Sequence, residues 1–318
     1  MTPTVHTARH TIEIEAAADT VYRLVADTER WPVVLGPTVH VRRLEGDDTD
    51  ELLALWATAN GSVRNWTSRR KLDPHSRRID FRQVTPSHPV AGMGGTWALE
   101  PLGADRTRVV LDHDFAAVDD DPDAVAWIDQ AMDRNSHAEL AAIKENAERS
   151  DEHARLTRTF ADSVHVDGSA DDIYAFLRAA DRWPERLPHV QRLDLTEEIE
   201  GLQIMVMDTR APDGDVHTTR SVRVCFDDEH RIVYKQIGLP ALLAVHTGEW
   251  TIVPDGDGVL ATSAHTVRVE RPAIRTVLGD GATGDDALAF VRRALGTNSL
   301  VTLNQARVYA EAAGATRG

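Results

Sequence analysis

The segment DTVYRLVADTERWP, residues 19–32, decides the fold of this chain because it occurs twice. It returns in altered form as DDIYAFLRAADRWP at residues 171–184. The two occurrences lie 152 residues apart in a chain of 318 residues. A spacing of this size indicates two tandem domains, because the repeats of a solenoid are much shorter. We therefore expect two copies of one fold, at residues 1–150 and 158–318, joined by a charged segment.

The repeat extends through both copies and preserves polar and aromatic residues as well as apolar ones. A Ser-x-Arg element, a tryptophan, a histidine and an Asn-Ser pair each recur at a matching place in the second copy. The matched pairs include Trp31 and Trp183, Ser68 and Ser221, Arg70 and Arg223, Trp97 and Trp250, His113 and His265, and Asn135 and Asn298.

Each copy is expected to begin with a strand and a short helix, followed by an antiparallel sheet. Residues 10–15 and 163–167 alternate between apolar and polar side chains, which predicts a half-buried strand. A short helix is expected next, with Asp19 or Asp171 as its cap. The Trp-Pro pair should end that helix, because a residue before proline is disfavoured in the α region. Several alternating segments separated by turn signals then predict an antiparallel sheet.

Each copy closes with a long amphipathic helix. Between residues 122 and 148, apolar side chains recur at steps of three to five, and the same stripe returns near the end of the chain. A helix over Pro122–Glu148 would be about 40 Å long, at 1.5 Å per residue. That length is enough to cross the concave side of a bent sheet, so the fold class is α+β.

Composition excludes several classes of partner. The formal net charge of −16 disfavours binding to nucleic acid or to an anionic membrane surface. The single cysteine, Cys225, cannot form an intramolecular disulfide, and the chain has no long apolar run. An apolar content of 42% is enough for a globular core. We expect a soluble, cytoplasmic protein.

One strand carries the first candidate site. Period-two alternation places Trp66, Ser68 and Arg70 on one face and Arg69 on the other. If that face points inward, the desolvation of a buried arginine must be offset by a carboxylate, by carbonyl groups or by a ligand. If it points outward, these residues decorate a solvated sheet face, which is the commoner arrangement. The second copy keeps Ser-x-Arg but replaces Arg69 with Val222, which favours a function on the first face.

Each of the remaining candidate site residues could instead have a purely structural role in the core. His113 and His265 have side chains that exchange protons near neutral pH, but a histidine can equally be a hydrogen-bonded core residue. Asn135 and Asn298 interrupt the helix stripes, where they either contact a ligand or lock the helix to the sheet. Trp31 is equally suited to a cavity wall or to core packing.

Taken together, these motifs resemble those of the polyketide aromatase/cyclases of bacterial type II polyketide synthases, in particular their di-domain branch. The resemblance implies a Bet v 1-like (START-like) helix-grip fold in each copy, with a seven-stranded antiparallel sheet around a long C-terminal helix and an interior pocket. In that family the pocket receives a poly-β-ketone chain tethered to an acyl carrier protein. The di-domain branch is associated with first-ring closure between C7 and C12. The motif residues are Trp31, Pro32, Trp66, Ser68, Arg70, Met93, Gly94, Trp97, His113 and Asn135.

Under this resemblance the chain is an enzyme for aldol cyclisation and dehydration that needs no metal or redox cofactor. Arginine is suited to stabilising an enolate or alkoxide oxygen, and histidine to moving protons. The catalytic candidates are Ser68, Arg70 and His113 in the first copy and Ser221, Arg223 and His265 in the second. The substrate-binding candidates are Trp31, Trp66, Met93, Trp97 and Asn135, and then Trp183, Trp250 and Asn298.

The two copies are not equivalent. Five of the seven tryptophans lie in the first copy, and Thr219 and His246 stand where the first copy has Trp66 and Met93. We expect the first domain to carry the main reaction and the second to assist dehydration or to act as a scaffold.

The partners implied are the carrier protein and other synthase components. The basic residues Arg69, Lys71, Arg77 and Arg82 are candidates for steering an acidic carrier, although a solvated strand edge explains them equally well.

Two other functions remain open. The same fold suits a non-catalytic carrier of lipids or other apolar ligands, and it suits a structural subunit of a synthase complex. No phosphate-binding glycine loop is present, and the spacing of histidine and aspartate residues predicts no metal site.

Overall fold

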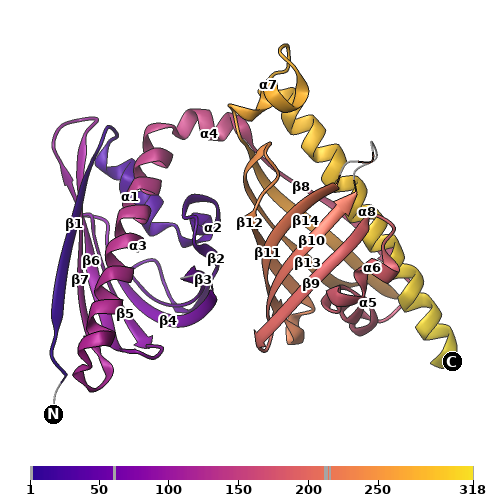
Figure 1. The fold of residues 1–318 in the computed structure, drawn as a ribbon, viewed down its shortest axis with the longest axis horizontal. Helices are drawn as coiled ribbons and strands as arrows, with labels where there is room; N and C mark the ends of the chain where they lie inside the picture. Colours follow the sequence, from indigo (N-terminus) through magenta and orange to yellow (C-terminus); the bar gives the residue numbers. More distant parts are fainter. Residues whose placement is uncertain (1–2, 60–61, 211–213, 215, 318) are drawn as a thin grey trace. The chain divides into compact units, whose positions relative to one another are not determined.

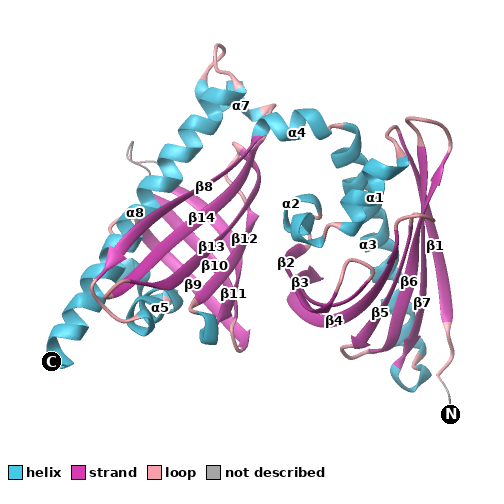
Figure 2. Ribbon diagram, turned by 180° about the vertical axis from the view of Figure 1, so that it is seen from behind, coloured by secondary structure: helices cyan, strands magenta, loops and turns pink. Residues whose placement is uncertain are grey.

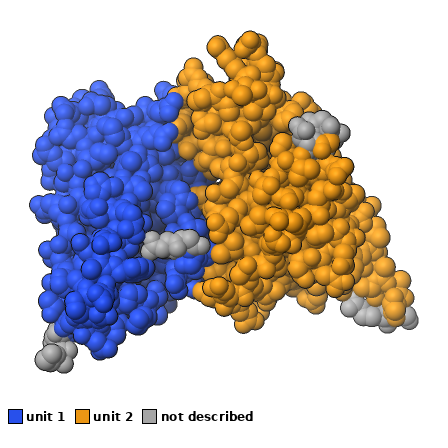
Figure 3. Space-filling model, viewed as in Figure 1, with its two compact units in different colours: residues 1–151 blue, residues 152–318 orange. Residues whose placement is uncertain are grey.

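The chain folds into two compact units, which are coloured separately in Figure 3. A computed structural model describes residues 3–59, 62–210, 214 and 216–317. The first unit comprises residues 1–151 and the second residues 152–318.

The first unit contains a seven-stranded antiparallel sheet with the strand order β1-β7-β6-β5-β4-β3-β2. Two short helices follow the first strand, and a long helix follows the last (Figure 1). The elements are β1 (His6–Ile14), α1 (Ala18–Ala26), α2 (Trp31–Val34), β2 (Thr38–Gly46), β3 (Asp50–Ala59), β4 (Ser62–Asp73), β5 (Arg78–Thr85), β6 (Val90–Pro101), β7 (Thr107–Ala117), α3 (Pro122–Glu148) and α4 (Ser150–Leu156), which runs from the first unit into the second.

The second unit repeats this plan, with the strand order β8-β14-β13-β12-β11-β10-β9. One further short helix, α7, precedes its long helix (Figure 2). The elements are β8 (Thr157–Val166), α5 (Ala170–Arg178), α6 (Trp183–Arg186), β9 (Val190–Ile199), β10 (Leu202–Arg210), β11 (Val216–Phe226), β12 (Arg231–Gly238), β13 (Leu243–Asp255), β14 (Gly258–Val269), α7 (Ala273–Leu278) and α8 (Gly284–Arg317).

The predicted tandem helix-grip architecture is confirmed, and α3 has the predicted bounds. Its start is fixed by Asp121, whose side chain accepts a hydrogen bond from the backbone N–H of Asp123, and by Pro122 in the first turn. Buried side chains at Ile128, Met132 and further along the helix then turn one face toward the protein interior. α3 packs mainly on β1 and α8 mainly on β8.

Two local expectations were wrong. The Trp-Pro pairs do not end α1 and α5 but begin α2 and α6, because proline's fixed φ suits the first turn of a helix. Asp19 and Asp171 are not caps. α1 follows Ala17, which has no capping side chain, whereas the Ser169 hydroxyl accepts from the backbone N–H of Asp172 at the start of α5.

Of the helices that the structure describes, none combines the length and apolarity needed to span a bilayer.

Candidate functional site

The first unit contains a cavity of about 620 Å³ between the sheet and α1, α2 and α3. Every catalytic and substrate-binding candidate of the first domain lines it. These residues are Trp31, Trp66, Ser68, Arg70, Met93, Trp97, His113 and Asn135. The inward orientation of the Trp66-x-Ser68-x-Arg70 face is therefore the correct one of the two that the sequence left open.

The cavity exists because the core of this unit is divided. One apolar cluster joins α1, α2 and the C-terminal half of α3, a second joins β7 to the N-terminal half of α3, and a third lies on β2 and β3. Ile143, Ile128 and Leu53 represent the three clusters, and each also lines the cavity. The apolar walls are thus contributed by side chains that stabilise the fold.

Arg70 lies in this wall and is only 3% exposed. Its Nε and Nη2 groups donate to the carboxylate of Glu51, with an Nε–Oε1 distance of 2.8 Å. Nη1 and Nη2 also donate to the backbone oxygens of Val25 (3.0 Å) and Ala26 (2.7 Å). The guanidinium lies over the ring of Trp31, 5.1 Å from its centroid. Among the described residues, these contacts leave one of its five N–H donors, on Nη1, without a hydrogen-bond partner.

Glu51 is the partner that the sequence analysis missed. It is 2% exposed, lies opposite Arg70 in the β3–β4 pairing, and also contacts Nε of Arg43 at 3.0 Å. Burial lowers the pKa of Arg70, and the Glu51 carboxylate opposes that effect. The Glu51 carboxylate offsets the cost of burying the Arg70 guanidinium, so no ligand is needed for this purpose. Arg70 is therefore a fixed positive charge in the cavity wall. The sequence pattern could have identified Glu51, because it alternates with Leu53 and Leu55 on the inward-facing side of β3.

Glu139 is the second residue that the sequence analysis missed. It lines the cavity from α3, one helical turn beyond Asn135 and Ser136. Met132, Ser136, Glu139 and Ile143 follow one another at steps of four, three and four, so a carboxyl group interrupts an inward-facing stripe. That interruption was the signal in the sequence.

The environment of Glu139 sets its protonation. Desolvation by the surrounding protein raises its pKa to about 7. The residue is partly exposed and lines the cavity. Near neutral pH both the acid and the carboxylate are populated, which is the condition for a side chain that must accept and return a proton.

His113 differs from Glu139 in that its environment favours the neutral form through a lowered pKa. Burial, reinforced by the neighbouring His10, lowers its pKa to about 4. Its ring packs edge-on against Phe81, and among the described residues its buried Nδ1 has no hydrogen-bond partner. His113 is therefore neutral near pH 7, where its imidazole can donate or accept a hydrogen bond.

In the second unit the predicted residues are packed into the interior. Arg223 is 1% exposed and donates to the side-chain oxygen of Gln203 (2.9 Å) and to the backbone oxygen of Leu177 (2.6 Å). It lies over the ring of Trp183, as Arg70 lies over Trp31. Of the other candidates, Ser221 and Trp250 are buried and Asn298 is half-buried.

A hydrogen-bonded cluster crosses the interior of the second unit. His265 Nδ1 is 2.8 Å from the Tyr234 hydroxyl and 3.0 Å from His246 Nε2, and its Nε2 is 2.8 Å from the Ser299 hydroxyl. Burial lowers the pKa of His246 to about 3 and that of His265 to about 4. The equivalent residues of the first unit, Phe81, Met93, His113 and Ser136, instead line the cavity.

The basic patch proposed from sequence is largely paired with carboxylates. Arg69 contacts Asp50 at 2.6 Å, Arg77 contacts Asp19 at 2.6 Å and Arg82 contacts Asp114 at 2.7 Å. Lys71 is exposed on the same strand as Arg69. This surface is therefore less positive than the count of basic residues suggests.

Comparison with known proteins identifies the family of this chain. The family described as polyketide cyclase/dehydrase and lipid transport matches residues 5–148 and 157–303. The chain belongs to this family. It is 45% identical over 312 residues to the granaticin polyketide synthase bifunctional cyclase/dehydratase of Streptomyces violaceoruber, covering 98% of this chain and 96% of that one. It is also 45% identical over 318 residues to the actinorhodin counterpart of Streptomyces coelicolor, covering 97% and 98%.

Two solved structures of di-domain aromatase/cyclases have the same fold over nearly the whole chain. BexL, from the BE-7585A biosynthetic pathway, superposes with a TM-score of 0.88 at 50% identity, covering 96% of this chain and 99% of BexL. StfQ, from the steffimycin pathway, superposes with a TM-score of 0.85 at 36% identity, covering 97% and 99%. The resemblance seen in the sequence is confirmed: the chain is a di-domain polyketide cyclase/dehydratase of type II polyketide synthase pathways.

Proposed function

We propose that the cavity of the first domain catalyses the first-ring aldol cyclisation, between C7 and C12, and the following dehydration of a poly-β-ketone tethered to an acyl carrier protein. The observation that carries this proposal is Glu139, a carboxyl group with a pKa near neutrality inside an otherwise largely apolar cavity. Burying a carboxyl group costs free energy that binding of an apolar ligand does not require, whereas enolate formation requires a base whose pKa lies near the working pH.

The first step requires a base and a site for developing negative charge. The Glu139 carboxylate removes a proton from a methylene group between two carbonyls, and the enolate carbon attacks a second carbonyl to form the C–C bond. The remaining N–H of Arg70 and the imidazole of His113 donate to the oxygens that gain charge. The amide of Asn135 donates to a neighbouring carbonyl oxygen. The Ser68 hydroxyl donates to the backbone oxygen of Arg82 at 3.2 Å, and it can donate to a substrate carbonyl only after it turns away from that oxygen. Protonated Glu139 then returns its proton to the new alkoxide.

Dehydration uses the same carboxyl group in both forms. The Glu139 carboxylate removes a second methylene proton next to the new tertiary alcohol. The protonated Glu139 then gives that proton to the departing hydroxyl, the C–O bond breaks, and water leaves. The product gains a double bond, and no oxidant or reductant is consumed. Trp31, Trp66 and Trp97 provide flat walls that restrict the chain to folded conformers, which lowers the entropic cost of ring closure.

The proposal is tested by replacing Glu139 with glutamine in the full-length chain. We expect Glu139→Gln to lower the rate of first-ring formation in a reconstituted minimal synthase by about 100-fold or more, with spontaneous shunt products in place of the regiospecific ring. The matched control is Thr302→Val, because Thr302 occupies the equivalent position on α8. A folded Glu139→Gln protein with an unchanged rate and product profile would refute the assignment.

A further inference from the structure

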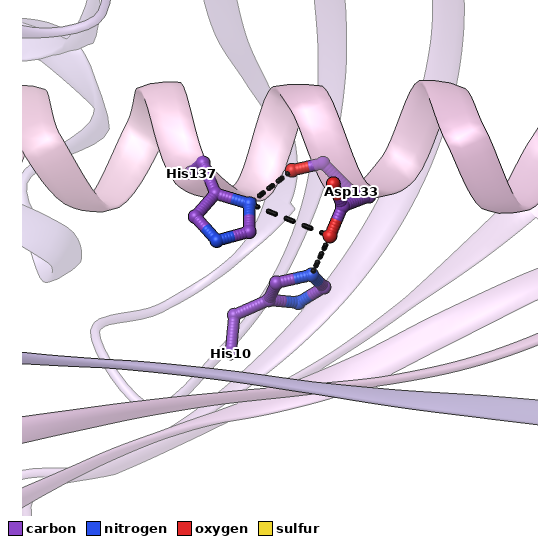
Figure 4. A group of neighbouring side chains, drawn as sticks. All are labelled: His10, Asp133 and His137. Atoms are coloured by element: carbon purple, nitrogen blue, oxygen red, sulfur yellow. Dashed lines mark hydrogen bonds and ion pairs between the residues drawn. The ribbon is translucent and has the colours of Figure 1, made fainter.

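Three potential metal ligands meet between β1 and α3 in the first domain (Figure 4). His10 comes from β1, and Asp133 and His137 come from α3. Nε2 of His10 is 3.0 Å from Oδ1 of Asp133, and Nδ1 of His137 is 3.4 Å from the same oxygen. One nitrogen or oxygen atom from each residue lies within 4.8 Å of the other two.

The backbone places all three groups. Asp133 and His137 are four residues apart, so they lie on the same face of the helix. His10 lies opposite Leu111 in the β1–β7 pairing, is only 8% exposed, and directs Nε2 at the helix. Figure 4 shows the imidazole of His10 below the helix and that of His137 beside it, with the Asp133 carboxylate between them.

We propose that His10, Asp133 and His137 bind a divalent transition-metal ion, with Zn²⁺ as the best match. Two imidazole nitrogens and one carboxylate oxygen form a donor set that zinc takes at bond lengths of about 2.0–2.2 Å. Ligand atoms around such an ion lie roughly 3–3.6 Å from one another, so small side-chain adjustments complete the site. Mg²⁺ and Ca²⁺ are disfavoured because they prefer oxygen ligands. A fourth position is left to water on the exposed side.

The second domain connects the equivalent strand and helix by an ion pair and without the three potential metal ligands. At the position equivalent to His10 it has Asp162, which forms a two-point ion pair with Arg292 of α8, at 2.7 and 2.8 Å. Gly296 and Leu300 replace the two helix ligands there. In the first domain, by contrast, two imidazoles converge on one carboxylate, and the buried Nδ1 of His10 has no partner among the described residues.

One existing contact limits the affinity. Nδ1 of His137 is 2.8 Å from the backbone oxygen of Asp133, so its N–H donates to that carbonyl in the metal-free state. Binding through Nδ1 requires loss of this proton and this hydrogen bond, and binding through Nε2 requires the exposed ring to turn. We therefore expect micromolar rather than nanomolar binding of Zn²⁺.

The test is calorimetric titration of the tag-free, full-length protein with ZnCl₂ after dialysis against a chelator. We expect one equivalent of Zn²⁺ to bind, and the absorption bands of added Co²⁺ to show coordination of low symmetry. His137→Ala and Asp133→Asn alter exposed residues, and each should weaken Zn²⁺ binding about tenfold or more.

The control is His217→Ala, which removes an exposed histidine from β11 of the second domain and should leave binding unchanged. Circular dichroism of each variant confirms that it is folded. Absence of binding at micromolar Zn²⁺, or binding that both His137→Ala and Asp133→Asn leave intact, would overturn the proposal and leave the three residues as a hydrogen-bonded tie.

Discussion

The two domains have the same strand order and matching registers, yet their interiors differ. Arg70 pairs with Glu51 and lies opposite Phe81, and Arg223 faces Gln203 and Tyr234 at the same places in its sheet. The first interior encloses a cavity. In the second, Tyr234, His246 and Ser299, which are equivalent to the cavity-lining residues Phe81, Met93 and Ser136, form hydrogen bonds with His265. The same backbone plan therefore accommodates two different sets of inward-facing side chains.

A few polar atoms account for the difference. Tyr234 adds a hydroxyl where the first domain has Phe81, and His246 adds an imidazole where it has Met93. Both side chains reach His265, so buried polar groups are satisfied only when they meet across the interior. Phe81 and Met93 have no such requirement. Consistent with this, Nδ1 of His113 has no hydrogen-bond partner among the described residues, whereas Nδ1 of His265 has two.

The largest expected difference between the domains concerns their buried arginines. Arg70→Met leaves the Glu51 carboxylate buried, with Arg43 as its one remaining cationic partner among the described residues, and should lower the free energy of unfolding by about 3–5 kcal/mol. Arg223→Met leaves the neutral Gln203 amide, and should cost about 1–3 kcal/mol. Urea denaturation of the full chain measures both changes.

The double variant Arg70→Met/Glu51→Leu sharpens this comparison, because it removes both charges and should recover most of the lost stability. Equal losses for Arg70→Met and Arg223→Met would show that Glu51 does not distinguish the domains.

The next largest effect concerns Glu139 and pH. The folded state holds its proton up to about pH 7, whereas the unfolded state releases it near 4.5. Between these values the folded protein binds more protons, so the contribution of Glu139 to stability falls as the pH rises. Glu139→Gln should therefore stabilise the protein by on the order of 3 kcal/mol at pH 8 and by little at pH 4.

Chemical denaturation at several pH values checks this expectation. Thr302→Val, the matched change in the second domain, should shift stability by the same amount at every pH. A Glu139→Gln effect that does not vary with pH would mean that this carboxyl group has an ordinary pKa in the folded protein.

The smallest effect concerns the helix that follows the first strand. α5 is capped by Ser169, whereas α1 follows Ala17, whose extended backbone (φ −61°, ψ 141°) already suits a capping residue. Ala17→Ser should therefore stabilise the first domain, and Ser169→Ala should destabilise the second, each by about 1 kcal/mol. Thermal melting curves measure both changes, and an unchanged melting temperature for the Ala17→Ser variant would show that the local geometry forbids the cap.

The sequence by itself determined the architecture. The repeat identified two domains, the 3.6-residue period located α3, and the alternation along β4 placed Ser68 and Arg70 on one face. These features depend on local periodicity, which residues close in the chain impose on one another. Recurrence of Ser68, Arg70 and His113 in the second copy then indicated some of the inward-facing polar side chains, but Glu51 and Glu139 do not recur and were missed.

Tertiary structure alone decided what those side chains do. Glu51 meets Arg70, and His10 meets Asp133, only after strands and helices distant in sequence have packed together. The protonation of Glu139 and His113 likewise depends on desolvation by many surrounding groups, which no sequence spacing encodes. Local pattern therefore fixes the fold, whereas contacts and burial contributed by remote residues fix the chemistry.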